Sequence, residues 1–350
     1  MLTCFTAHRV ASRGGNATLF GDTWKHGYCK NALEGIGRHR GGSMIERIAW
    51  LLAVLALFVI PIGLLLLKNF ASRWTILALI FFLANALYAV AYLAPWEIWG
   101  LWLLRGLSLI GAVAIAIGLY RLVKSSWQRP GWLALAASVF VVLGGAYLAY
   151  LNVRSVQARN LPSEPVALQW PLEDGRYYVV QGGAAPPLQR AHASTGARAY
   201  AVDLVKMGPA LHAYRDFLDY DFAESQIWDA PVYAPCDGEI EWARDGMPDG
   251  LDYDPDERKP AGNVVSIKCQ GVSVQIPHFR QDSIAVEVGQ RVVAGDLLGR
   301  IGNSGSASGP HLHIHAERGP LKEDYSDNTP VPITFNGRFL SRGDIYEAGR

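Results

Sequence analysis

Four long apolar stretches constrain this chain more than any other feature. They cover residues 48–67, 74–94, 98–120 and 131–151, and each is about 20 residues long, the length that crosses the hydrocarbon core of a bilayer. Half of all residues are hydrophobic and only 18% are charged, a balance too apolar for a wholly soluble protein. We therefore predict four transmembrane helices within residues 44–151, with the lipid bilayer as a partner.

Basic residues in the connections predict the orientation of these helices. The first and third connections carry Lys68, Arg73, Arg121, Lys124 and Arg129. The second connection, around residues 95–97, carries no Lys or Arg. By the positive-inside rule, the first and third connections are cytoplasmic, and the C-terminal half faces the opposite side. Arg105 is a charge near one end of the third stretch, and we expect it to reach the interface.

Residues 1–43 do not fit this topology. They are rich in basic residues and lack both a periodic apolar pattern and the apolar core of a secretory signal. We hypothesise that translation begins at Met44 and that 1–43 is a doubtful leader. The alternative is a disordered cytoplasmic tail, which would reverse the topology.

The C-terminal half has a different sequence pattern. Residues 152–168 are polar, contain two prolines and predict a linker, whereas 169–341 predict short strands punctuated by Gly and Pro. The expected strands are 177–181, 198–204, 231–234, 239–244, 263–269, 272–277, 297–301 and 311–316. A short helix is expected at 213–222, and 342–350 form a tail. The predicted fold is an α-helical four-span membrane bundle followed by an all-β antiparallel domain.

Several features exclude other kinds of site. A net charge of +1 and the absence of a basic run with interleaved aromatics argue against nucleic-acid binding. The acidic segment 245–262 does not match the ligand spacing of a calcium loop, which favours a surface loop. No Cys-x-x-Cys pair exists, so a thiolate zinc site is not expected. Whether Cys236 and Cys269 form a disulfide stays open, because sequence does not give their separation.

Three histidines alternate with apolar residues in segment 309–315. They are His311, His313 and His315, and they follow the glycine-rich turn 302–305. Alternation places them on one face of a strand, with same-face neighbours about 7 Å apart. One imidazole can then bind a metal while the next reaches a bound water. For this segment alone, histidines on the solvent side of an edge strand are an equally good interpretation.

Other residues of this half favour a metal. His192 and His278 also lie here, and Asp203 interrupts the apolar run 199–204. A carboxylate in such a run is costly to bury unless it is paired or bound to a metal. Two histidines and one aspartate make a three-ligand set with an open fourth position, typical of a catalytic zinc, and two of the remaining histidines would serve proton chemistry.

Taken together, segments 302–305 and 309–313 resemble the terminal motif of the lysostaphin-type zinc metallopeptidases. These are peptidoglycan endopeptidases with a compact antiparallel β-fold. Segments 230–238, 288–296 and 330–340 also fit the family pattern, so the resemblance covers about residues 177–340. The four apolar stretches lie outside it.

The resemblance implies a role for each candidate site residue. His192, Asp203 and His313 would hold Zn²⁺, and His278 and His311 would be catalytic. Two further histidines, His212 and His315, have no counterpart in the family motif and are expected at the surface or around the metal ligands. Two departures stand out: His192 and Asp203 are eleven positions apart, much more than in many members, and a proline rather than an aromatic residue precedes His278.

The expected function is a membrane-anchored zinc metalloendopeptidase. It would hydrolyse peptide bonds in peptidoglycan cross-links or stem peptides, from the outer face of a bacterial cytoplasmic membrane. Zinc would lower the pKa of a bound water towards about 7, where a histidine can accept its proton. The alternatives are a catalytically inactive cell-wall-binding or amidase-activating module, and a membrane sensor regulated by the β domain.

Overall fold

The computed structural model describes residues 44–66, 72–127, 129–193, 196–214, 222–250, 260–320 and 328–349. Residues 41–350 form one compact unit. The predicted leader 1–43 lies outside the described residues, as do most of the predicted helix 213–222 and much of the acidic loop.

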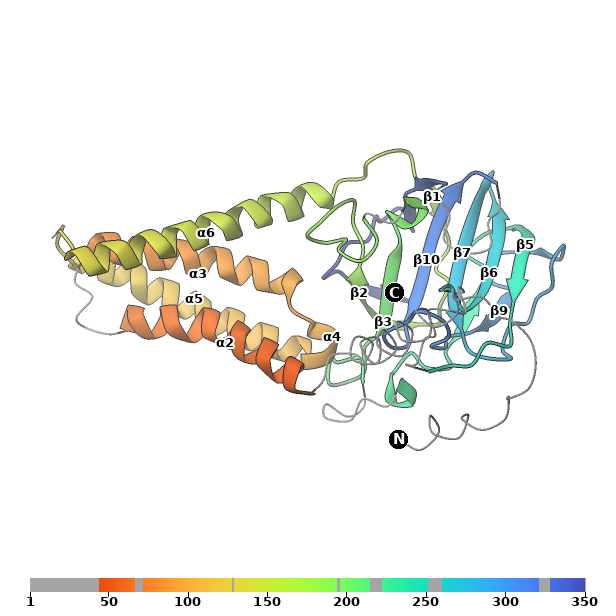
Figure 1. The fold of residues 1–350 in the computed structure, drawn as a ribbon, viewed down its shortest axis with the longest axis horizontal. Coiled ribbons are helices and arrows are strands. Elements are labelled where there is room, and N and C mark those ends of the chain that lie inside the picture. Colours follow the sequence, from red (N-terminus) through yellow and green to blue (C-terminus); the bar gives the residue numbers. More distant parts are fainter. Residues whose placement is uncertain are drawn as a thin grey trace, which may run out of the picture. The chain divides into compact units, whose positions relative to one another are not determined.

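The N-terminal part of the described chain is helical. Its helices are α2 (Met44–Leu66), α3 (Arg73–Leu93), α4 (Trp96–Trp99), α5 (Leu101–Lys124) and α6 (Trp132–Ala158). The four long helices run alongside one another, and α4 is a short turn between α3 and α5 (Figure 1). Among the described residues, α3, α5 and α6 are long and apolar enough to cross a membrane, while α2 offers the shorter apolar stretch Leu51–Leu65. Four spans are predicted from the sequence, and three of the described helices qualify as candidate spans.

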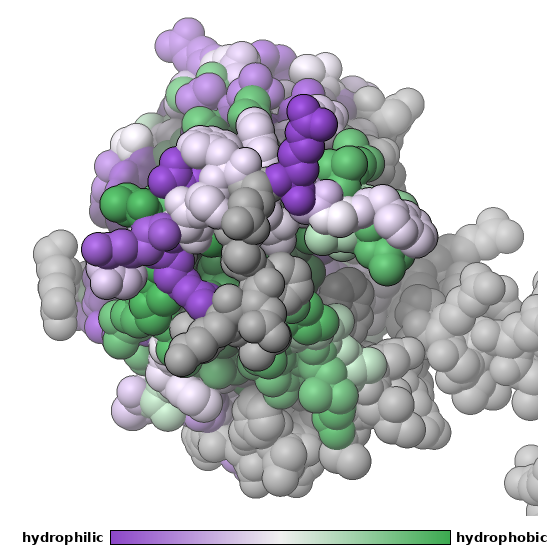
Figure 2. Space-filling view, turned by 90° about the vertical axis from the view of Figure 1, so that its left-hand side faces the viewer, coloured by the Kyte–Doolittle hydropathy of each residue, from purple (hydrophilic) through white to green (hydrophobic). Residues whose placement is uncertain are grey.

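Apolar side chains cover much of the surface of these helices. Large residues such as Leu109 on α5 and Phe140 on α6 are exposed. The view from the helical end shows apolar patches on this part of the molecule (Figure 2). Exposed apolar surface on helices of this length is what contact with lipid requires.

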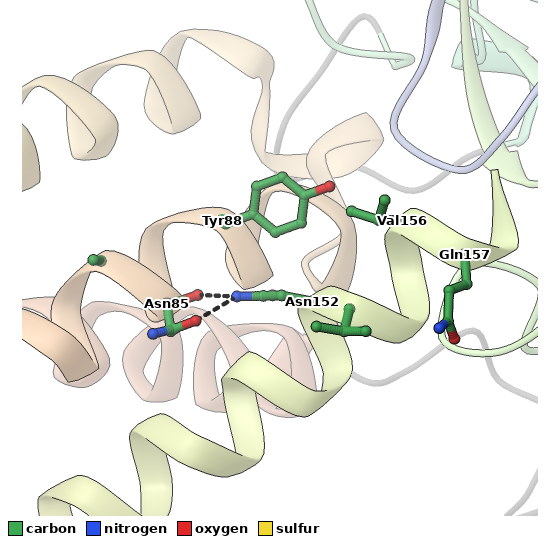
Figure 3. A pocket seen from close by; sticks show the side chains of 7 residues that line it. Asn85, Tyr88, Asn152, Val156 and Gln157 are labelled. Atoms are coloured by element: carbon green, nitrogen blue, oxygen red, sulfur yellow. Dashed lines mark hydrogen bonds between the residues drawn. The ribbon is translucent and has the colours of Figure 1, made fainter.

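A polar contact joins α3 to α6 within this apolar surrounding. Asn152 Nδ2 donates to the backbone oxygen and to Oδ1 of Asn85, both at 3.1 Å (Figure 3). The Tyr92 hydroxyl donates to Asn152 Oδ1 at 2.9 Å. Interhelical hydrogen bonds of this kind help transmembrane helices to associate. Beside them lies a pocket of about 460 Å³, lined mainly by apolar surface that includes Tyr88 and Val156.

The C-terminal part is rich in strands. They are β1 (Val166–Leu168), β2 (Gly175–Gln181), β3 (Val202–Lys206), β4 (Pro231–Tyr233), β5 (Gly238–Arg244), β6 (Asn263–Cys269), β7 (Val272–Phe279), β8 (Arg291–Val292), β9 (Leu297–Arg300), β10 (Leu312–Arg318), β11 (Thr329–Val331), β12 (Ile333–Phe335) and β13 (Ile345–Ala348). Nine of them form one sheet in the order β13-β2-β3-β10-β7-β6-β5-β8, with β11 on β10 (Figure 1). All pairings in it are antiparallel, and β1 pairs with β12 in parallel outside it.

Successive side chains of β2 and β3 belong alternately to two different apolar clusters. Tyr177 and Val179 join the core of the β-rich half, whereas Tyr178 joins a cluster with helical side chains. On β3, Leu204 lies in the β core and Val205 in the helical cluster. Because side chains alternate between faces, Asp203 shares the face of Val205 and points away from the β core.

Arg342 joins the β-rich half to the helices. Its side chain is buried, and its Nε donates to the carbonyl of Tyr92, in the last turn of α3, at 2.7 Å. A guanidinium suits this position because the carbonyls at a helix C-terminus have no partner within the helix. The backbone amide of Leu101 also donates to Leu211 at 2.9 Å.

Several predicted boundaries differ from the observed elements. Helix α6 continues to Ala158 and so enters the predicted linker. The predicted tail contains β13, which pairs with β2. The strand predicted at 198–204 begins at Val202, because Gly196–Arg198 forms a short 3-10 helix. Cys236 and Cys269, whose pairing the sequence leaves open, form a disulfide with Cα atoms 6.1 Å apart.

Candidate metal centre

Two adjacent strands bring a carboxylate and an imidazole face to face. His313 on β10 pairs directly with Asp203 on β3 in the antiparallel register. Directly paired residues lie on the same face of a sheet. The Nδ1 atom of His313 lies 2.9 Å from Oδ1 of Asp203, and both side chains are buried.

A third group comes from the loop between β2 and β3. His192 Nε2 lies 2.9 Å from Oδ2 of Asp203, so the two carboxylate oxygens contact different imidazoles. The rings of His192 and His313 lie 4.8 Å apart and are nearly perpendicular. Ligand atoms of His192, Asp203 and His313 all lie within 4.8 Å of one another. The long spacing between His192 and Asp203 is therefore compatible with a common centre.

His278 and His311 flank this centre. The ring centroids of His278 and His311 are 5.3 Å apart, and His311 Nε2 lies 3.9 Å from Asp203 Oδ1. Together with His313 they make a second group with ligand atoms within 4.8 Å of one another. His313 thus belongs to both groups that can hold a metal among the described residues.

Backbone carbonyls fix the rings of these two flanking histidines. His278 Nδ1 donates to the carbonyl of Ser304, and His311 Nδ1 donates to that of Gly309, each at 2.8 Å. A carbonyl only accepts, so Nδ1 of each ring carries the proton. In the neutral tautomer the lone pair of each ring is then on Nε2, ready to accept a proton.

The glycine-rich turn 302–305 positions the carbonyl that holds His278. Gly305 has φ +72°, and a Cβ atom there would collide with the backbone of Gly262. The turn therefore passes too close to its neighbour for any larger residue. His278 itself has φ +67° at the end of β7, an uncommon conformation for a non-glycine residue that is often found at functional sites.

Burial and mutual contact set the charges in this cluster. Burial would raise the pKa of Asp203, but His192 and His313 outweigh it and hold that pKa well below its usual value. Burial lowers the pKa of His313 to about 4, against the opposing effect of Asp203. Burial, followed by the neighbouring histidines, also lowers the pKa of His278 and of His315 well below 6.5. At pH 7 the buried carboxylate of Asp203 therefore lies among the neutral imidazoles of His278, His313 and His315.

That charge state fits a divalent cation. Neutral imidazole nitrogens and a carboxylate oxygen are the donor types that zinc prefers. A buried carboxylate is costly without a compensating positive charge, and a bound cation supplies one. Three protein ligands would leave a fourth zinc position for water, and His278 and His311 lie beside His192, Asp203 and His313. The residues present are thus suited to Zn²⁺.

The structure brings all five candidate site residues close together, namely His192, Asp203, His278, His311 and His313. Of the two histidines without a counterpart in the motif, His315 is buried and contacts His313, so of its two expected positions it takes the one around the candidate ligands. His212 lies elsewhere, in a loop that contacts the start of α5. Sequence reasoning did not anticipate the carbonyls of Ser304 and Gly309, although the conspicuous glycine-rich turn points to a backbone role there.

Comparisons with known proteins support the peptidase family that the histidine motif indicates. Residues 220–327 match the model of Peptidase family M23. This range contains His278, His311 and His313, whereas His192 and Asp203 precede it. No curated protein matches the chain.

Solved structures show weaker likenesses. A zinc-containing peptidase from Vibrio cholerae is 20% identical over 48% of this chain and 39% of its own, with a TM-score of 0.29. The catalytic domain of the prophage-encoded M23 protein EnpA from Enterococcus faecalis is 18% identical over 43% of this chain and 88% of its own, with a TM-score of 0.28. The catalytic domain of lysostaphin from Staphylococcus simulans is 18% identical over 44% of this chain and 88% of its own, with a TM-score of 0.26.

This chain therefore spans less than half of the Vibrio protein, and the assignment rests on the family match rather than on these structures. The β-rich half of the chain contains a domain of Peptidase family M23, which confirms the lysostaphin-type family indicated by the histidine motif.

Proposed function

We propose that this protein is a membrane-anchored zinc metalloendopeptidase. Its metal ligands are His192, Asp203 and His313, and its substrate is a peptide bond in peptidoglycan cross-links or stem peptides. The observation that carries the proposal is the convergence of these three groups from distant segments, with His278 and His311 beside them. The substrate class rests on the family match.

Zinc held by these residues would polarise the scissile carbonyl and lower the pKa of a bound water. The protein's own contribution is to fix that ion and to move protons. Asp203 supplies the negative charge, and its two contacts with His192 and His313 orient all three ligands. Burial of the three excludes bulk water, which strengthens their attraction for a cation.

The flanking histidines can divide the proton transfers. His278 is neutral at pH 7 and presents the lone pair of Nε2, so it is suited to accept the proton of the attacking water. His311 is less buried, and in its imidazolium form it can donate the Nε2 proton to the leaving amine as the C–N bond breaks. The water oxygen ends on the new carboxyl group, one of its protons ends on His278 Nε2, and exchange with solvent then restores the starting protonation of both rings.

The helices supply the anchor. With α3, α5 and α6 as spans, we propose α2 as a fourth, because its 23 residues extend about 34 Å at the usual helical rise of about 1.5 Å per residue. Four spans place both ends of the bundle on one side of the membrane. Arg73, Arg121 and Lys124 lie at the other side, which the positive-inside rule makes cytoplasmic.

Two observations support an outward-facing peptidase domain. The domain contacts α4, in the connection that has no Lys or Arg, through the Ala213 amide and the Glu97 carbonyl at 2.8 Å. It also contains the Cys236–Cys269 disulfide, a bond typical of oxidising compartments. We therefore propose that it works in the periplasm or at the exterior of a bacterial cytoplasmic membrane.

Digestion of purified muropeptides by the full chain in detergent tests this function. The zinc-loaded wild type should cleave stem peptides or cross-links, and a His313→Ala variant should bind little zinc and cleave none. Zinc binding without cleavage would favour an inactive cell-wall-binding module. A chain that binds no zinc would defeat the proposal.

A further inference from the structure

We propose that His315 is a positioning residue that fixes the proton of the His313 ring, so that the Nδ1 lone pair of His313 faces the metal. This inference rests on the proposed function, because it assigns a task to a residue beside a zinc ligand. The observation behind it is a contact between His313 Nε2 and His315 Nδ1 at 3.1 Å.

The two nitrogens of His313 face different partners. Nδ1 lies 2.9 Å from Asp203 Oδ1, on the side where the three candidate ligands converge, whereas Nε2 faces His315. The His313 and His315 rings are nearly perpendicular, at 84°, with centroids 5.2 Å apart. His313 is 1% exposed and His315 is 2% exposed, so bulk water does not replace either ring as a hydrogen-bond partner.

Imidazole chemistry then restricts the tautomer. A neutral ring carries one proton, and the nitrogen that binds a metal must offer its lone pair. If His313 binds through Nδ1, its proton lies on Nε2 and needs an acceptor in a buried place. His315 Nδ1 is at hydrogen-bond distance and can accept it. Such outer partners orient metal-binding histidines and raise their affinity for the ion.

The sheet holds both histidines in place. Strand β10 pairs with β3 at His313 and with β7 at His315, where Gln275 is the paired residue. Both histidines therefore belong to a backbone ladder, and their period-2 spacing keeps them on one face. A hydrophobic residue at 315 would fill the same space but offer no acceptor.

Zinc affinity of the full chain, measured by chelator competition in detergent, tests this role. His315→Leu should weaken zinc binding about 10- to 100-fold, the usual cost of losing an outer partner, and should alter the visible spectrum of the Co²⁺ form. His315→Glu should restore most of the affinity, because a carboxylate accepts the same proton. The control Ile314→Val disturbs the buried neighbour without touching the ring contact, and should leave zinc affinity unchanged.

Nitrogen NMR of ¹⁵N-histidine-labelled wild type gives a second readout that needs no variant. In the zinc form, His313 should carry its proton on Nε2. A proton on Nδ1 of zinc-bound His313, or equal zinc affinity of wild type and His315→Leu, would overturn the inference. So would a His315→Glu variant that binds zinc no better than His315→Leu. A wild type that binds no zinc would defeat the proposed function instead.

Discussion

His313 on β10 lies directly opposite Asp203 on β3, and His313 Nδ1 is 2.9 Å from the carboxylate. The backbone ladder of two central strands therefore sets the distance between two of the candidate ligands. The third candidate ligand, His192, lies in the loop between β2 and β3 rather than on a strand. Its side chain is held by the contact with Asp203. This arrangement leads to separate predictions for the ligands and for the residues around them.

The proposed division of roles predicts different consequences for His192 and His278. His192→Ala should abolish both zinc binding and hydrolysis, because it removes a ligand. His278→Ala should keep zinc bound and lose hydrolysis by about 10²–10⁴-fold, the usual contribution of a general base. Metal analysis and muropeptide digestion of both variants check this. Loss of zinc in His278→Ala would instead favour the group formed by His278, His311 and His313.

The metal-free chain should lose stability in acid. In the folded chain the pKa values of His278 and His313 lie below the usual 6.5, and that of His313 is about 4. At a pH between about 4 and 6.5, the unfolded chain therefore binds more protons than the folded chain does. The free energy of unfolding therefore falls as pH drops below 6.5 towards 4. Asp203, whose pKa is also lowered, loses its stabilising contribution as pH falls further, below 3.8.

Thermal unfolding in chelator at several pH values measures this effect. The melting temperature should decrease steadily from about pH 7 to about pH 5, and a His313→Gln variant should show a shallower decrease because one titrating group is gone. A melting temperature that rises on acidification would contradict the predicted sign.

The disulfide should contribute to the stability of the β-rich half. Cys236 and Cys269 are 33 residues apart in the chain, and closing a loop of that size stabilises a fold by about 2–4 kcal/mol. Replacing both by serine should lower the free energy of unfolding by this amount. Denaturant unfolding measures it, and the double variant should be insensitive to reductant. Reactive thiols at Cys236 and Cys269 themselves, mapped by alkylation of the unfolded, unreduced wild type, would show that the bond does not form.

Gly305→Ala should disturb both the fold and the His278 ring. The residue has φ +72°, and its new Cβ would collide with the backbone of Gly262, so the turn must move. We expect a loss of stability of about 1–2 kcal/mol from the left-handed conformation alone, and lower activity because the Ser304 carbonyl shifts. Gly289→Ala is a matched control, since Gly289 has φ +85° and open space around it. Equal effects of the two substitutions on activity would contradict a special role for the turn.

Asn152→Leu should weaken the contact between α3 and α6. The substitution removes hydrogen bonds to Asn85 and from Tyr92, which are worth about 0.6–2 kcal/mol in a membrane. Unfolding in mixed detergent measures the loss. A Val153→Leu change on the same helix is the control, and an equal effect of both would argue against the polar contact.

The grouping of the candidate ligands was more predictable from the sequence than the strand arrangement around them. Alternation of His311, His313 and His315 fixes their common face, and the costly position of Asp203 in an apolar run identifies it as a candidate ligand. The burial of His315 follows from β10 changing its partner from β3 to β7, a long-range pairing that no local pattern reveals.

Other parts depend on tertiary contacts in the same way. Strand β13 forms from a short segment whose pairing with β2 supplies its stability, so the sequence alone suggests a tail. Helix α6 extends past the apolar stretch because Ser155 and Ala158 are buried at its end, although the surrounding residues are polar. Apolar length predicts the part of a helix within a membrane better than it predicts where the helix ends.

X-ray absorption and anomalous diffraction at the zinc edge test the metal centre most directly. The zinc-loaded full chain should show one ion bound by His192 Nε2, a carboxylate oxygen of Asp203 and His313 Nδ1, with metal–nitrogen distances of about 2.0–2.1 Å. An ion bound instead by His278, His311 and His313, or no ordered zinc among these side chains, would contradict the proposed centre.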